Sequence, residues 1–167
     1  FFIVRHGQPL DLEEDRHIYN APLGDTGKQQ AKLAAKEIQK LGGIDIIYSS
    51  TLHRALDTAE AFYEEYDAPW HAWPTLCETG RRDWPAIRKE GRPKNIEDGP
   101  VWDSEYPKES FPLLSKLKLK YPNIELSQPY DWPDAWWMPM RKETREMSYE
   151  RAEFVIREIK AKHENED

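Results

Sequence analysis

The chain has 167 residues, of which 38% are hydrophobic and 33% charged, and its formal net charge is −7. This length and balance suit one globular domain with a packed core. The negative charge disfavours nucleic acid and anionic membranes as partners, and no apolar run reaches the ~20 residues needed to cross a bilayer. The single cysteine, Cys77, excludes an internal disulfide and a cysteine-based zinc site, so a reducing, cytoplasmic setting is the default.

The first half of the chain alternates between predicted strands and helices. A continuous apolar run over residues 1–5 predicts a strand covered on both faces, as in parallel sheets. Helical spacing of apolar residues predicts a helix over 26–41, for which Asp25 or Thr26 offers the N-cap. A second strand is expected over residues 44–48.

A second helix is expected directly after Ser49-Ser50. Its buried stripe is expected to consist of Leu52, Ala55, Ala59, Phe62 and Tyr66. Residues 70–77 predict a third strand, in which Pro74 indicates an irregular or edge position. This order of elements predicts an α/β fold, a three-layer sandwich in which helices flank a mostly parallel central sheet.

The stretch from about residue 81 to 145 differs in composition from the rest of the chain. It holds nine of the 13 prolines and five of the seven tryptophans. Prolines at this density exclude long helices and central strands over most of the stretch, and only residues 111–120 predict a short helix. The tryptophans supply too much apolar area for a solvated linker, so we expect an ordered insertion or lid within a single domain over 1–167. These tryptophans are Trp84, Trp102, Trp132, Trp136 and Trp137.

A last helix is expected over residues 144–162. Its inner face is expected to carry Ala152, Val155, Ile156 and Ile159. His163 follows in a polar tail, where a histidine commonly interacts with the C-terminal end of a helix dipole.

Groups suited to phosphoryl transfer follow the predicted strands. Arg5-His6, Ser49-Ser50 and Glu78 all come where a strand ends, and ligands bind beyond the carboxyl ends of parallel strands. His6 can attack phosphorus with a neutral ring nitrogen. Arg5 carries a permanent charge, and its planar fork matches two phosphate oxygens. Glu78 is a candidate proton donor, although a nearby arginine such as Arg81 could simply pair with it.

Two further residues extend this predicted phosphate site. Gly7 lets the backbone approach a ligand closely and present its N–H. Arg54 lies in the first turn of the second predicted helix, where it adds a guanidinium near a helix N-terminus that already favours anions. Taken singly, His6 could be a core histidine and the arginines surface ion-pair partners. The convergence of the strand ends favours the phosphate site.

Four motifs occur in order along the first half of the chain. They are Val4-Arg5-His6-Gly7-Gln8, Pro22-Leu23 followed by Gly27 and Gln30-Ala31, Tyr48-Ser49-Ser50-Thr51-Leu52-His53-Arg54-Ala55 followed by Thr58-Ala59, and Leu76-Cys77-Glu78. In order and spacing they resemble the histidine phosphatase superfamily, in its phosphoglycerate-mutase-like branch. The resemblance implies that His6 becomes phosphorylated and that Glu78 acts as acid and base. It also implies that Arg5 and Arg54 hold the phosphoryl group.

The chain departs from this family pattern in three places. Leu12 stands where many relatives have an asparagine, and Gln8 or Asn20 could supply the substrate hydrogen bond in its place. Gly24 stands where the family usually has a threonine. The family also places a second histidine after a late strand, in a Ser-His-Gly-like segment that this chain lacks. We do not expect His163 to replace it, and we expect the second histidine to lie beyond the last residue of this chain.

The leading functional prediction is a phosphatase that passes the phosphoryl group of a phosphate monoester to His6 and then to water. No metal or cofactor is expected, because arginines supply the positive charge. The alternatives are a phosphoglycerate-mutase-type enzyme and a non-catalytic module that keeps the phosphate pocket. Arg81 could contribute to a substrate carboxylate site in a mutase, but the segment over 78–82 lacks the fuller mutase-like pattern. The expected partner is a phosphorylated small molecule, and the oligomeric state is left open, with a homodimer as one option.

Overall fold

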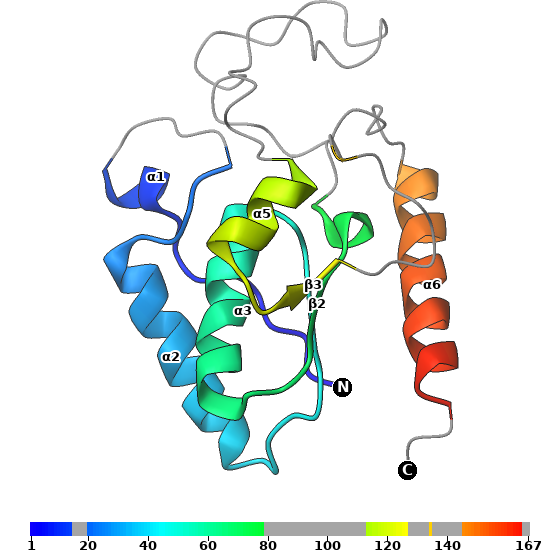
Figure 1. Cartoon of the computed structure of the whole chain (residues 1–167), viewed down its shortest axis with the longest axis horizontal. Helices are drawn as coiled ribbons and strands as arrows, with labels where there is room; N and C mark the ends of the chain where they lie inside the picture. Colours follow the sequence, from blue (N-terminus) through cyan, green and yellow to red (C-terminus); the bar gives the residue numbers. More distant parts are fainter. Residues whose placement is uncertain (15–19, 79–112, 127–133, 135–144, 165–167) are drawn as a thin grey trace, which may run out of the picture.

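A parallel sheet of three strands organises the chain (Figure 1). The computed structural model describes residues 1–14, 20–78, 113–126, 134 and 145–164. The strands are β1 (Ile47–Ser49), β2 (Trp70–Ala72) and β3 (Ile124–Glu125), in the order β1-β2-β3. The other elements are α1 (Leu10–Glu13), α2 (Asp25–Gln39), α3 (His53–Tyr66), the 3-10 turn η1 (Pro74–Leu76), α5 (Leu114–Lys120) and α6 (Arg145–Lys162).

The side chains of the sheet alternate between two faces, as the pleat requires. Ile47 pairs with Trp70, and Trp70 pairs in turn with Ile124. All three are buried in one hydrophobic cluster, together with residues of α3 and α5. The next row points to the opposite face, where Tyr48 pairs with His71 and their rings stack at a centroid distance of 5.1 Å.

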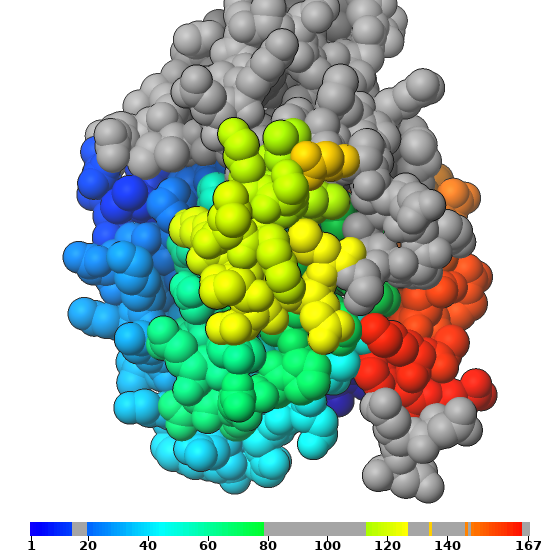
Figure 2. Space-filling model, in the orientation of Figure 1, coloured from blue at the N-terminus to red at the C-terminus, as the bar shows by residue number. Residues whose placement is uncertain are grey.

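Helices cover both faces of this sheet, which confirms the predicted α/β sandwich. α3 packs on β1 and β2, and α2 packs on α3. In the space-filling view α5 and β3 lie against α3 (Figure 2). α6 runs along the opposite side (Figure 1), where His163, just past its end, places Nε2 2.7 Å from the Tyr48 hydroxyl. None of the helices that the structure describes is long and apolar enough to cross a membrane.

The helix predicted over 26–41 is confirmed as α2, but its N-terminus is capped in a different way. Asp25 and Thr26 are the first two helical residues, and the N-cap is Gly24, which makes no side-chain capping bond. The carboxylate of Glu13 instead accepts hydrogen bonds from the backbone N–H groups of Asp25 and Thr26, at 3.0 and 2.9 Å. A negative group at a helix N-terminus accepts hydrogen bonds from the free N–H groups and interacts favourably with the positive end of the helix dipole.

The strand predicted over residues 1–5 is wrong for this structure. Phe1 and Ile3 are 97% and 101% exposed, and the segment has no regular secondary structure. A strand exists only where a neighbouring strand pairs its N–H and C=O groups. No strand of the described residues pairs with this segment, so its apolar run is neither paired nor covered.

The third predicted strand is shorter than expected. β2 ends at Ala72, and Pro74 starts the turn η1 rather than interrupting a strand. Of the two positions that Pro74 indicated, the irregular one is confirmed, because Pro74 lies outside the strand, whereas β2 is the middle one of the three described strands and not an edge. Proline has no N–H to donate to a neighbouring strand, but it suits the first turn of a helix. This explains why β2 ends before Pro74 and why η1 begins there.

The last helix is confirmed as α6, but the predicted inner face is partly wrong. Val155 is buried as expected, whereas Ile156 is 55% exposed and Ala152 also faces solvent. The helix is turned so that Arg151, rather than Ala152, lies on the covered side. Polar contacts explain this orientation of the helix, because Arg151 donates hydrogen bonds to the backbone carbonyl groups of Thr75 and Cys77.

The insertion predicted over about 81–145 is described only in part. The short helix expected over 111–120 is confirmed as α5, and Leu114 and Leu117 bury its inner face. β3 follows it and was not predicted, since a strand of two residues carries no periodic signal. The five tryptophans of the insertion and the lid that they suggested lie outside the described residues.

The backbone after His6 packs directly on the first turn of α2, at a position where only glycine fits. A Cβ atom on Gly27 would lie 2.1 Å from the carbonyl oxygen of Gln8. A Cβ atom on Gly7 would lie 2.4 Å from the carbonyl oxygen of Gly27. Both atoms belong to backbone, which cannot move aside as a flexible side chain does, so two glycines are required for this contact.

We predict that Gly27→Ala lowers the free energy of unfolding by about 1–3 kcal/mol, the usual range for overpacking. The sign is informative, because glycine to alanine within a helix normally stabilises a protein by about 0.5–1 kcal/mol. Urea denaturation measures the change, and Gln29→Ala, an exposed site in the same helix, is the control with little expected effect. A Gly27→Ala variant as stable as the parent would contradict the close contact.

Candidate active site

His6 is the centre of the candidate site, and its ring is oriented by the neighbouring backbone. Nδ1 lies 2.8 Å from the carbonyl oxygen of Gly7. A carbonyl can only accept a hydrogen bond, so Nδ1 carries the proton and the neutral ring keeps a free lone pair on Nε2. Burial, opposed by this hydrogen bond, lowers the pKa of His6, and the charges of Arg54 and Arg5 lower it further. The neutral, nucleophilic form is therefore favoured.

The backbone of Gly7 is held by Thr58, a residue for which the motifs predicted no role. The Gly7 N–H, which we expected to face a ligand, donates to the hydroxyl oxygen of Thr58 at 3.1 Å. That hydroxyl donates in turn to the carbonyl of Arg54 at 2.7 Å. Thr58 belongs to the motif after Arg54, but only the fold brings its side chain under the first motif. One hydroxyl therefore connects the backbones of the two predicted phosphate-binding segments.

Arg54 and Glu78 form an ion pair beside His6. Nη2 of Arg54 lies 2.9 Å from Oε2 of Glu78, and the two side chains are 14% and 48% exposed. The charge of Glu78 also acts on His6, raising its pKa against the larger effects that lower it. The structure therefore brings together His6, Arg54 and Glu78 as predicted. It pairs Glu78 with Arg54, and Arg81, the alternative partner, lies outside the described residues.

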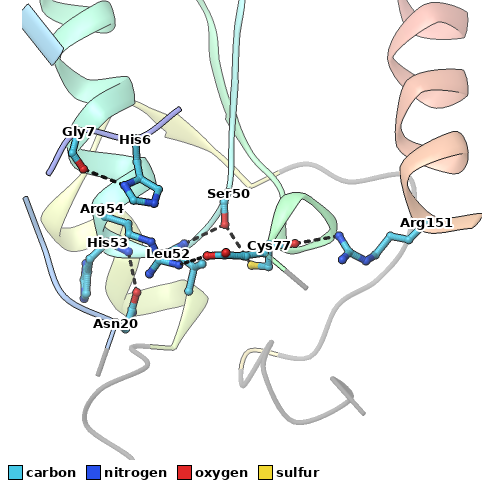
Figure 3. A network of polar contacts seen from close by, with 10 residues as sticks. His6, Gly7, Asn20, Ser50, Leu52, His53, Arg54, Cys77 and Arg151 are labelled. Carbon is cyan, nitrogen blue, oxygen red and sulfur yellow. Dashed lines mark hydrogen bonds and ion pairs between the residues drawn. The ribbon is translucent and has the colours of Figure 1, made fainter. Parts of the chain in front are cut away.

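The N-terminus of α3, which carries Arg54, is capped from a distant loop. Oδ1 of Asn20 accepts a hydrogen bond from the backbone N–H of His53 at 2.9 Å (Figure 3). Asn20 is 2% exposed and has a left-handed φ of 51°, a conformation that asparagine tolerates better than most residues. The predicted contact of Asn20 with substrate stays a prediction. Its visible contact is with the helix that positions Arg54.

The remaining predicted binding residues that the structure describes are Gln8 and Arg5. The backbone N–H of Gln8 donates to Oε1 of Gln30 at 2.9 Å, which fixes the chain directly after Gly7. Arg5 is exposed, and its charge lowers the pKa of His6. A cavity of about 150 Å³ beside His6 is lined by Arg5 and by residues of α2. Arg54 and Glu78 do not line it, so this cavity is not by itself a phosphoryl site.

Cys77 joins the turn before Glu78 to the connection between β1 and α3. Its thiol lies 3.1 Å from the Ser50 hydroxyl (Figure 3). It also lies 3.5 Å from the Thr51 hydroxyl. The residue is buried, and burial raises the pKa of the thiol. The Ser50 hydroxyl also accepts a hydrogen bond from the backbone N–H of Leu52. The contacts of this serine therefore stabilise the start of α3.

Asp57, on the same helix as Arg54, is a polar centre that sequence reasoning missed. Its carboxylate accepts a hydrogen bond from the N–H of Leu23 at 2.8 Å and one from the hydroxyl of Tyr121 at 2.5 Å. Lys120 lies 3.5 Å from it. Burial, with the charge of Lys120, lowers the pKa of the adjacent His53 to about 4, so His53 is neutral near pH 7. No local sequence pattern reveals this role of Asp57, because Leu23 and Tyr121 lie far from it in the sequence.

The fold and these groups define an α/β protein with a histidine set among arginines and a glutamate, the class suited to phosphoryl transfer. The family model for the histidine phosphatase superfamily (branch 1) matches residues 1–113. The chain therefore belongs to the histidine phosphatase superfamily.

Relatives in this superfamily include both a mutase and phosphatases. The 2,3-bisphosphoglycerate-dependent phosphoglycerate mutase of Gloeothece citriformis is 30% identical over 90 residues, which cover 42% of this chain and 39% of the mutase. A mycobacterial glucosyl-3-phosphoglycerate phosphatase solved with VO3 is 33% identical over 48% of this chain and 39% of its own, with a TM-score of 0.41. The chain thus spans about two fifths of each of these relatives.

A third relative covers more of the chain. The ecdysone phosphate phosphatase of Bombix mori, solved with tungstate, has a TM-score of 0.57 at 17% identity. The match covers 96% of this chain and 66% of that protein. At this identity the likeness shows the fold alone, and it extends past the first half in which the motifs lie.

We predict that Arg54→Gln raises the pKa of His6, measured by NMR titration of the imidazole C–H signals. A neighbouring cation disfavours the imidazolium, so its removal makes protonation easier. Glu78→Gln should shift the same pKa in the opposite direction, because it removes a charge that stabilises the imidazolium.

Arg54→Lys keeps the charge and is the matched control, with a smaller expected shift than Arg54→Gln. The signal of His6 is assigned by its loss in His6→Gln. An unchanged or lower pKa in Arg54→Gln would show that Arg54 does not act on the His6 ring.

Proposed function

We propose that this protein hydrolyses phosphate monoesters through a phosphohistidine formed on His6. The observation that carries the proposal is the orientation of the ring, in which the Gly7 carbonyl holds Nδ1 in its protonated form. Nε2 is then the nucleophilic nitrogen, and the lowered pKa of His6 favours its unprotonated form. A histidine held in one tautomer among permanent cations is poorly suited to a purely structural role.

In the first step Nε2 attacks phosphorus. The N–P bond forms as the bond between phosphorus and the ester oxygen breaks, and the carboxyl group of Glu78 gives its proton to the departing oxygen. Arg54 and Arg5 hold the phosphoryl oxygens and offset their charge. In the second step water attacks phosphorus, its proton passes to the Glu78 carboxylate, and cleavage of the N–P bond releases phosphate and neutral His6.

The ion pair between Arg54 and Glu78 gives this sequence a simple order. In the structure Arg54 pairs with the carboxylate of Glu78 at 2.9 Å. A phosphoryl group carries more negative charge than a carboxylate and competes for the same guanidinium. Its binding to Arg54 would release Glu78 from the ion pair. Substrate binding thereby frees the carboxyl group that acts in the first step.

The alternative is a mutase, which returns the phosphoryl group to another hydroxyl of the bound substrate. The similarity to a bisphosphoglycerate-dependent mutase over 90 residues favours this candidate. Efficient return of the group requires that water be excluded from the phosphohistidine. Glu78 is 48% exposed, and an acid so open to water supports hydrolysis over return of the group.

We predict that the full-length protein releases phosphate from 4-nitrophenyl phosphate and that His6→Ala lowers kcat/KM at least ~10³-fold, because the nucleophile is lost. Glu78→Gln should also lower it, since the leaving oxygen loses its proton donor. His163→Gln replaces a histidine that contacts Tyr48 rather than His6 and should keep the parent activity.

A second assay supplies 3-phosphoglycerate with a bisphosphoglycerate primer. Efficient isomerisation with little phosphate release would overturn hydrolysis in favour of the mutase. Binding of inorganic phosphate by calorimetry, without turnover of either substrate, would overturn both and leave a phosphate-binding module.

A further inference from the structure

Arg151 connects α6 to the candidate site. Nη1 of Arg151 donates hydrogen bonds to two backbone carbonyls, those of Thr75 at 2.6 Å and Cys77 at 2.9 Å. Arg151 is half-buried, and Figure 3 shows its side chain reaching from α6 to the Cys77 segment. The contact joins the last described helix to the turn that leads into Glu78.

The position of the second carbonyl matters, because it belongs to the peptide unit between Cys77 and Glu78. A peptide unit is planar, so a bond to its oxygen also fixes the direction of the Glu78 N–H and Cα. The thiol of Cys77 is held from the opposite side by the hydroxyls of Ser50 and Thr51. Residue 77 is thus fixed between the β1–α3 connection and α6, directly before the proposed acid.

Glu78 depends on this backbone support more than a buried residue would. Its side chain is 48% exposed, and its ion pair with Arg54 is the contact that a phosphoryl group would take over. When that happens, the position of the carboxyl group is set mainly by the backbone to which it is attached. Displacement of a catalytic group by about 1 Å can cost about 10²-fold in rate.

We propose that Arg151 is a positioning residue that holds Glu78 in place for proton donation to the leaving group. The inference rests on the proposed function, in which Glu78 is the acid of the first step. Arginine suits this task because it is always charged and one of its nitrogens can serve two carbonyls at once. Hydrogen bonds from a charged donor are also stronger than neutral ones.

The test uses the dependence of kcat/KM on the leaving group, because this parameter reports the step in which the ester oxygen departs. A good leaving group such as 4-nitrophenolate needs little protonation, whereas a poor one depends on the acid. The substrates are substituted phenyl phosphates of similar size, from 4-nitrophenyl to 4-methylphenyl phosphate, together with benzyl phosphate. All variants are made in the full-length protein.

We expect Arg151→Met to lower kcat/KM roughly tenfold for benzyl phosphate and far less for 4-nitrophenyl phosphate, as for a displaced acid. Glu78→Gln should show the same selectivity with a larger loss, about 10²–10⁴-fold for benzyl phosphate. Arg151→Lys keeps the charge and should restore part of the lost rate. Arg157→Met is the matched control, because Arg157 lies on the same helix with its side chain 71% exposed and should leave the profile unchanged.

Circular dichroism and thermal melting establish that each variant is folded, and Arg151→Lys serves alone if Arg151→Met is not. An equal loss for all leaving groups in the Arg151 variants, with selective loss in Glu78→Gln, would overturn the inference and leave the proposed function standing. No selective loss in Glu78→Gln would remove Glu78 as the acid, and the inference about Arg151 would fail with it.

Discussion

The site depends on the satisfaction of one buried N–H group, that of Gly7. This N–H donates to the Thr58 hydroxyl, which donates onward to the carbonyl of Arg54. An unpaired buried N–H would cost about 1–3 kcal/mol, so the first segment cannot move away from α3 without penalty. On the other side the same segment meets Gly27 at a distance that admits no side chain. Contact with two helices therefore sets the direction in which His6 points, and the chemistry follows from that direction.

Much of the fold could be predicted from local patterns, and the exceptions share a physical cause. The helical spacing behind α2 and α3 lies within one segment, which is why Arg54 was placed correctly in a first helical turn. The caps supplied by Glu13 and Asn20 come from 12 and 33 residues away, so no local pattern could reveal them. Residues 1–5 have the composition of a strand, but a strand depends on a neighbour in space. Arg151 reaches Cys77 across 74 positions of sequence.

The same long-range contacts explain how distant parts of the chain serve one site. Tyr121, which follows α5 in the insertion, donates to Asp57 on the helix that carries Arg54. Asp57 also holds Leu23, at the end of the loop that caps that helix through Asn20. α3 is therefore fixed by the insertion on one side, while α6 fixes the turn before Glu78 on the other. Arg54 and Glu78, the proposed phosphate ligand and acid, are thus positioned by separate elements, and their side chains form an ion pair.

The most direct test of the account is the chemical identity of the phosphorylated intermediate. The full-length protein is mixed with substrate, quenched in base and digested, and the phosphohistidine isomer is identified by ³¹P NMR and by isomer-specific antibodies. Because Nδ1 donates to the Gly7 carbonyl, the account predicts phosphate on Nε2 of His6. Phosphate on Nδ1, on another residue, or on no residue during turnover would contradict it.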